Sequence, residues 1–102
     1  MEAAKLKILS IDIFKANKGE VIARADIHFD GFLVKGFKVL RDESGANYVT
    51  PPSYLSPHGW RPIFKTDSPE DWQAIKNGIL KSYDEYLMKE AMEEPSYEKD
   101  MF

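Results

Sequence analysis

Alternating apolar and polar residues between positions 21 and 40 predict a β-hairpin. The segment reads VIARADIHFDGFLVKGFKVL, with Asp30 and Gly31 between two alternating runs. An Asp-Gly pair in this setting favours a two-residue type I′ turn, because that turn needs positive φ at both central residues. The expected cross-strand partners are Phe29 with Phe32, Ile27 with Val34, and Asp26 with Lys35.

The two faces of the first hairpin strand differ in character. One face is apolar throughout and is expected to be buried. It carries Val21, Ala23, Ala25, Ile27 and Phe29. The other face carries Ile22, Arg24, Asp26 and His28. On this wetter face, Asp26 and Lys35 are expected to form a cross-strand ion pair.

The neighbouring segments extend this hairpin into an antiparallel meander. Residues 6–14 alternate with apolar residues on both faces, which predicts a strand that is central or covered on both sides. Residues 17–19 and 41–45 are turn signals. Residues 47–50 are a candidate fourth strand, and Gly36 within the third strand indicates a bulge or close packing.

Residues 51–66 read PPSYLSPHGWRPIFKT and are expected to form a long irregular loop, because proline cannot donate hydrogen bonds to a strand ladder. A loop of this length in a small domain is usually functional or disordered. Its Tyr, Leu, Trp, Ile and Phe side chains make it too apolar for disorder. Residues 63–65 are a candidate minimal strand that returns to the sheet.

The last third of the chain predicts one amphipathic helix. Ser68 suits the N-cap and Pro69 the first helical position, and the acidic residues that follow complement the helix dipole. Apolar residues then recur three or four positions apart. They are Trp72, Ile75, Ile79, Tyr83, and Tyr86 or Leu87. The helix is expected to end between residues 88 and 91, or at Glu94 before Pro95.

These elements predict an α+β fold in which an antiparallel meander sheet of three to five strands carries one main C-terminal amphipathic helix. Residues 1–94 are expected to form a single domain, since a chain of 102 residues rarely supports two cores. Residues 95–102 are expected to be a frayed acidic tail. The apolar content of 43% is sufficient for a compact core and argues against disorder.

Several kinds of chemistry are absent from the sequence. There is no cysteine, the two histidines have no third ligand at a recognised spacing, and no phosphate-binding or hydrolase motif occurs. We therefore expect no enzymatic activity, metal, cofactor or small-molecule substrate. No apolar run approaches the length of a membrane span and no signal-peptide pattern opens the chain, so we expect a cytoplasmic protein without a membrane partner.

Charge is distributed unevenly along the chain. Residues 1–66 hold ten basic and seven acidic residues, a net charge of +3, whereas residues 67–102 hold four basic and ten acidic residues, a net charge of −6. One interpretation is a solvated helix followed by an acidic tail. The other is that a polyanion would contact the N-terminal part while the acidic end faces away or regulates access.

Aromatic and basic residues interleave in the loop of residues 51–66. Such rings can stack on nucleic-acid bases while the cations contact phosphates, helped by cations on the third strand. The candidate nucleic-acid-binding residues are therefore Arg61, Lys65, Tyr54, Trp60, Lys38 and Arg41. The alternative interpretation is that the rings hold the loop against the core and the cations only face solvent.

An ordered set of residues over about positions 6–87 resembles the stage V sporulation protein G family of septation regulators. It consists of an apolar first strand, Gly19–Ile27, Phe32–Val39, Gly45, Tyr48-Val49, Pro52-Ser53, Pro57–Gly59, Ile75, Ile79, Leu80 and Tyr83. The resemblance implies a small, dimeric, cytoplasmic bacterial protein that binds DNA and RNA to regulate gene expression, without catalysis. In that family a Lys-Arg pair after Pro-Ser is implicated in nucleic-acid contact. Here those positions are Tyr54 and Leu55, and Arg61 falls within a residue of a later basic position.

Two hypotheses follow. The first is a homodimeric DNA- or RNA-binding regulator whose dimer contact comes from strand edges or from the apolar loop. The second is a non-enzymatic protein-interaction module that uses the loop of residues 51–66 and the acidic helix. The departure at Tyr54 and Leu55 motivates the second, because two lost cations remove phosphate contacts.

Overall fold

A four-stranded antiparallel sheet covered by one helix is the main body of the molecule. The computed structural model describes the backbone of residues 6–99 and the side chains of residues 6–92. The sheet has the order β1-β2-β3-β4, and its strands are β1 (Ile8–Lys18), β2 (Val21–Phe29), β3 (Phe32–Arg41) and β4 (Asn47–Thr50). A second, two-stranded sheet contains β5 (Ser53–Ser56) and β6 (Gly59–Pro62), and α1 (Pro69–Lys99) follows. The predicted α+β meander with one C-terminal helix is confirmed.

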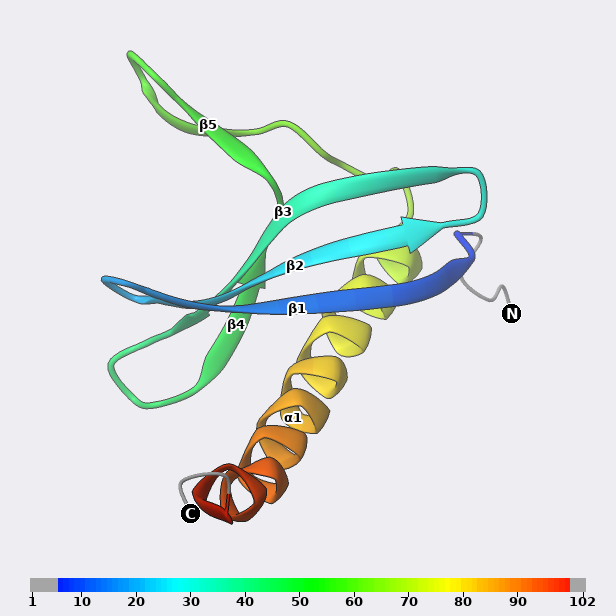
Figure 1. The fold of residues 1–102 in the computed structure, drawn as a ribbon. Coiled ribbons are helices and arrows are strands. Elements are labelled where there is room, and N and C mark those ends of the chain that lie inside the picture. The colour runs from blue at the N-terminus through cyan, green and yellow to red at the C-terminus, as the bar shows by residue number, and fades with distance from the viewer. Residues whose placement is uncertain (1–5, 100–102) are drawn as a thin grey trace.

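Figure 1 shows α1 lying across one face of the four-stranded sheet, while the β5–β6 hairpin projects away from the helix. We call the sheet face opposite α1 the open face. The face against α1 holds the core, as the alternation in β2 predicts for Ala23, Ala25, Ile27 and Phe29. Val21, which the alternation places on the same face, instead pairs with Leu40 and lines a cleft on the open face, because the register shifts between Val21 and Ala23. The buried apolar residues are Ala23, Ala25, Ile27, Phe29, Phe37, Val39, Val49, Ile75, Ile79 and Tyr83. A Cβ on Gly78 would lie 3.1 Å from Cδ1 of Ile11, so the helix and β1 are in close contact at that point.

The β2–β3 hairpin turns at Asp30-Gly31 as predicted, but the expected type I′ turn is wrong, because Gly31 has a φ of +102° while Asp30 has no positive φ. The register of the hairpin also changes further along. Phe29 pairs with Phe32 and Ile27 with Val34, as expected. A bulge then shifts the register between Ala25 and Ile27, and Gly36 on β3 has a φ of +100°. The bulge predicted at this glycine is thus confirmed.

The prediction of an ion pair between Asp26 and Lys35 is wrong, because this bulge changes what faces Asp26. The extra residue turns the backbone N–H of Gly36 toward Asp26, and it donates to the Asp26 Oδ1 at 3.1 Å. Asp26 is only 5% exposed and forms its ion pair with Arg24, whose Nε lies 3.4 Å from Oδ1. The carboxylate therefore supplies the acceptor that the bulged strand requires.

The segment of residues 51–66 is not an irregular loop, because its middle forms the β5–β6 hairpin. The predicted strand at residues 63–65 is absent, and Ile63 instead donates its backbone N–H to the Pro52 carbonyl at 2.7 Å. Pro51 and Pro52 precede the hairpin, Pro57 lies in its turn, and Pro62 occupies the last of its four paired positions, so no proline interrupts the middle of the ladder.

The helix begins as predicted and extends further than predicted. Ser68 is the N-cap, with its Oγ accepting from the backbone N–H of Asp71 at 3.3 Å. The expected end at or before Glu94 is wrong, since α1 continues past Pro95 to Lys99. A proline removes one backbone donor from a helix and need not end it. Of the expected frayed tail, residues 100–102 lie outside the described residues.

Candidate nucleic-acid interface

The β5–β6 hairpin presents two different faces. Its two-residue turn, Pro57-His58, is closed by Ser56, whose Oγ donates to the Gly59 carbonyl at 2.7 Å and accepts from the His58 N–H at 3.2 Å. Tyr54 pairs with Arg61, and Leu55 pairs with Trp60. Since opposite residues in an antiparallel pair share a face, Tyr54 and Arg61 lie on one face of the hairpin and Leu55 and Trp60 on the other.

Trp60 faces the main sheet and meets Lys38 there. The Lys38 Nζ lies 5.2 Å from the centroid of the indole ring, within cation–π range. The two residues border a cleft of about 480 Å³ between the hairpin and the open face. Its other lining residues are Glu20, Val21, Leu40, Thr50, Pro51 and Ser53. Trp60 is 63% exposed, so most of its ring remains accessible.

A second aromatic–cation pair lies on the same open face, and the sequence reasoning missed it. The Arg24 guanidinium carbon is 4.5 Å from the centroid of the Phe14 ring. Phe14 on β1 pairs with Arg24 on β2, and Arg24 pairs with Lys38 on β3. The alternation had placed Arg24 on the wetter face, and a correct β1–β2 register would have placed Phe14 beside it.

Arg41 and Lys65 are separated from these groups. Arg41 ends β3 at a position of the same parity as buried Val39, so it points to the helix side of the sheet rather than to the open face. Its Nε donates to the Asn47 Oδ1 at 3.3 Å. The neighbouring Asp42 carboxylate has a pKa held below its ordinary value of about 3.8, because the Ser44 hydroxyl and then the Ala46 N–H donate to it. This carboxylate is therefore ionised at neutral pH.

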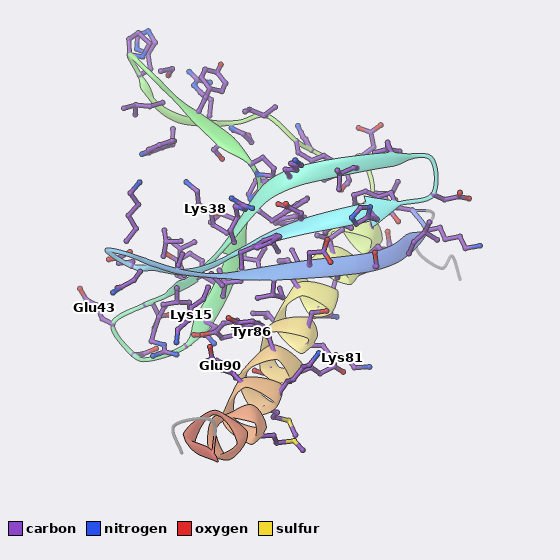
Figure 2. The ribbon with its side chains drawn as sticks, in the orientation of Figure 1. Lys15, Lys38, Glu43, Lys81, Tyr86 and Glu90 are labelled. Atoms are coloured by element: carbon purple, nitrogen blue, oxygen red, sulfur yellow. The ribbon has the colours of Figure 1, made fainter. Side chains whose placement is uncertain are left out.

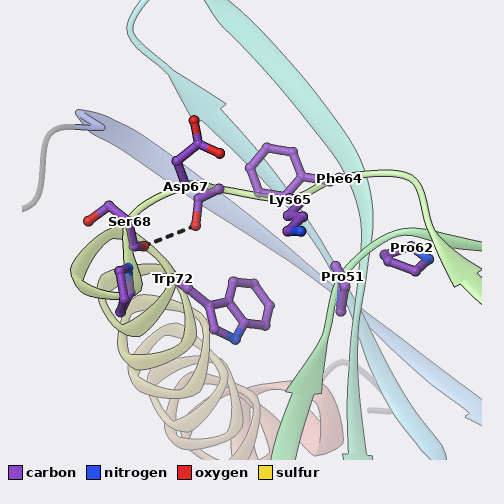
Figure 3. Close-up of a pocket in the computed structure, with 9 residues that line it drawn as sticks. Pro51, Pro62, Phe64, Lys65, Asp67, Ser68 and Trp72 are labelled. Atoms are coloured by element: carbon purple, nitrogen blue, oxygen red, sulfur yellow. Dashed lines mark hydrogen bonds between the residues drawn. The ribbon is translucent and has the colours of Figure 1, made fainter.

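Lys65 belongs to a different cavity, at the start of α1 (Figure 3). This cavity has a volume of about 390 Å³, and its apolar wall is formed by Pro51, Pro62, Phe64 and Trp72. The Thr66 hydroxyl donates to the Ser68 carbonyl at 3.1 Å and fixes the chain entering the helix. The six predicted residues therefore divide into four locations: Lys38 and Trp60 are in contact at the cleft, Tyr54 and Arg61 are on the other face of the hairpin, Arg41 is at the end of β3, and Lys65 is in the cavity at the start of α1.

The charged residues that line the cleft are Lys38 and Glu20, and the hairpin segment beside it differs in charge from the helix. The segment of residues 51–66 contains no acidic residue, whereas the described side chains of α1 include five acidic and three basic ones. Figure 2 shows Lys38 on the sheet, away from Tyr86 and Glu90 of α1, where Glu90 Oε1 lies 3.5 Å from the Lys15 Nζ. In the part of the chain that the structure describes, no group of three or more His, Cys, Asp or Glu side chains could hold a metal ion.

Comparison with known proteins identifies the family. No protein-family model matches the chain. A protein of Archaeoglobus fulgidus that is named, provisionally, septation protein SpoVG is 32% identical over 81 residues, which cover 78% of this chain and 95% of that protein. The chain belongs to the SpoVG family. The resemblance noted in the sequence is thus confirmed, while the bacterial origin it implies stays a prediction, because this SpoVG relative comes from an archaeon.

In this SpoVG-family chain, the two positions of the family's Lys-Arg pair lie on the projecting hairpin. Tyr54 is 52% exposed and Leu55 is 67% exposed, on opposite faces of β5. Neither side chain can contribute a cation, so the features that suit a polyanion here are Lys38 and the cleft beside Trp60, Arg61 on the hairpin, and the Arg24–Phe14 pair on the open face. Within residues 6–99, no helix has both the length and the apolar character that crossing a bilayer requires.

Proposed function

We propose that this SpoVG-family protein is a cytoplasmic regulator that binds DNA or RNA as a homodimer, in control of septation, sporulation and cell division. The observation that carries the proposal is the contact of Lys38 with an exposed Trp60 at the mouth of a cleft, beside an acid-free hairpin that also presents Arg61. Aromatic platforms beside cations suit the bases and phosphates of a nucleic acid. We propose neither catalysis nor a cofactor or small-molecule substrate.

The homodimer is proposed because one protomer offers few cations and leaves apolar surface exposed. Leu55 and Ile63 on and beside the hairpin are 67% and 68% exposed, and Met88 and Met92 of α1 are 65% and 75% exposed. Apolar surface of this kind is typical of contacts between subunits. Pairing two protomers would double the number of cations available to one polyanion.

The proposal predicts binding to oligonucleotides that weakens steeply with salt. Displacement of counterions from phosphates makes the logarithm of the binding constant fall linearly with the logarithm of the salt concentration. The measurement is fluorescence anisotropy of labelled single-stranded and duplex oligonucleotides across a salt series, with the mass of the free protein from light scattering. Absence of binding at low salt, binding that is flat in salt, or a monomeric mass would contradict the proposal.

A protein partner is the second candidate function. It is favoured by Leu55 and Ile63, two exposed apolar residues at and beside the hairpin that a nucleic acid does not require. On this alternative, Leu55→Asp would abolish capture of a protein partner, while Arg61→Gln would leave that capture unchanged. The nucleic-acid proposal predicts that Arg61→Gln weakens oligonucleotide binding more than Leu55→Asp does.

A further inference from the structure

The register of the four strands aligns four residues into one line across the open face. Phe14 is opposite Arg24, Arg24 is opposite Lys38, and Lys38 is opposite Thr50. We call these four residues the cross-sheet row. Neighbouring strands lie about 4.8 Å apart, so Phe14 and Lys38 are separated by about 10 Å. Trp60 extends the row, because it lies over Lys38 from the hairpin.

Two aromatic rings, each with its own cation, lie along this row: Phe14 at its β1 end and Trp60 over Lys38. Phe14 is 44% exposed beneath Arg24, and Trp60 is 63% exposed beside Lys38. The Arg24 side chain is 51% exposed, and its charge is shared with the buried carboxylate of Asp26. Lys38 forms none of the ion pairs found among the described residues. The row therefore offers flat stacking surfaces and little net charge.

We propose that the open face binds one unpaired nucleic-acid strand running along the cross-sheet row, with one base stacked on Trp60 in the cleft and another on Phe14. Lys38 contacts the phosphate next to the base on Trp60, and the Arg24 guanidinium supports the second base. This inference rests on the proposed nucleic-acid binding. It adds that the bound nucleic acid is single-stranded and names the residues that select a single strand over a duplex.

Two features of the surface favour a single strand over a duplex. Stacking on a side chain requires a base that has left its own stack, and a paired duplex does not offer one. The hairpin also stands over the row, so that the cleft is bounded by Trp60 on one side and by Val21 and Leu40 of the sheet on another. With few phosphate contacts, base stacking has to supply a large share of the affinity.

The test compares the affinity of variants for a short labelled oligothymidine and for a duplex of the same length. Trp60→Ala is expected to weaken binding of the oligothymidine about 5- to 100-fold, the range that the loss of one base-stacking ring produces. Trp60→Phe is expected to restore most of the affinity. Phe14→Ala is expected to weaken binding by about fivefold or more. The duplex is expected to bind the wild-type protein more weakly than the single strand does.

Two matched controls lie outside the row. Leu33→Ala removes an exposed apolar side chain near the far end of β3, and Lys35→Gln removes an exposed lysine of the same strand. Both are expected to bind the oligothymidine within about twofold of the wild type. Circular dichroism of each variant checks that the sheet is intact.

The outcomes separate this inference from the proposed function. If the wild type binds in a salt-dependent way but Trp60→Ala and Phe14→Ala bind equally well, the protein binds nucleic acid and the row is not its site. The same conclusion follows if the duplex binds as tightly as the single strand. If no oligonucleotide binds even at low salt, both the inference and the proposed function fail.

Discussion

Replacement of Phe37 by alanine is expected to lower the free energy of unfolding by about 3–5 kcal/mol. Phe37 is completely buried in β3. Its ring meets the ring of Phe64 edge-on, with the centroids 5.3 Å apart, and stacks beside Trp72 of α1 at 6.5 Å. The alanine would leave a cavity between the sheet, the segment after the hairpin and the start of the helix. Urea denaturation followed by circular dichroism measures the loss.

Two further variants keep this prediction testable. Phe37→Leu retains much of the volume and is expected to cost about 1 kcal/mol, which allows comparison if the alanine variant does not fold. Phe32→Ala removes a ring of the same strand that is 48% exposed and stacks on Phe29 at 4.9 Å, and its cost is expected to be at most about 1 kcal/mol. Equal urea midpoints of unfolding for Phe37→Ala and Phe32→Ala would mean that the core is not centred on Phe37.

The double variant Lys38→Gln with Arg61→Gln is expected to show the largest effect on the salt dependence of nucleic-acid binding. Lys38 borders the cleft and Arg61 lies on the exposed face of the projecting hairpin. For a single strand, each lost phosphate contact lowers the slope of the logarithm of the binding constant against the logarithm of the salt concentration by about 0.7. Two lost contacts therefore lower the affinity on the order of 50-fold at about 50 mM salt. Anisotropy titrations at several salt concentrations measure both quantities.

The helix offers a control with the same change in charge. Lys81→Gln with Lys89→Gln removes two exposed lysines from α1, and Figure 2 shows Lys81 on the helix, away from Lys38. This variant is expected to keep the wild-type slope and to lose little affinity, because the helix covers the opposite face of the sheet. If both double variants weaken binding equally, the interaction follows net charge and has no preferred face.

Local signals explain why the main sheet and the start of the helix are predictable. The Asp30-Gly31 turn fixes its own register through backbone conformation, and the alternation beside it identifies the buried face. The start of the helix is also predictable, because Ser68 as the N-cap and Pro69 as the first helical residue are recognisable within a few consecutive residues. A glycine within a strand indicates the bulge at Gly36 from the sequence alone. The hydrogen bond that the Gly36 N–H donates to Asp26 could not be predicted, because it depends on how the bulge orients the backbone groups of β3.

The β5–β6 hairpin and the cross-sheet row depend on information that is not local. The strands SYLS and GWRP are only four residues long and have prolines at or beside their ends, so neither shows an alternation that indicates a buried face. The row depends on the register of β1 against β2, which shifts between Lys15 and Lys18. A difference of one residue in that register would place Phe14 opposite Ala23 or Ala25 instead of Arg24.

The account depends on one claim, that a nucleic acid is held against the open face beside the hairpin. The chain has two tryptophans, Trp60 at the cleft and Trp72 half-buried at the start of α1. Their indole N–H signals can be followed separately in a ¹H–¹⁵N spectrum while a short oligothymidine is added. We expect the Trp60 signal to shift progressively to saturation and the Trp72 signal to remain in place. A stationary Trp60 signal under conditions of saturated binding would contradict the account.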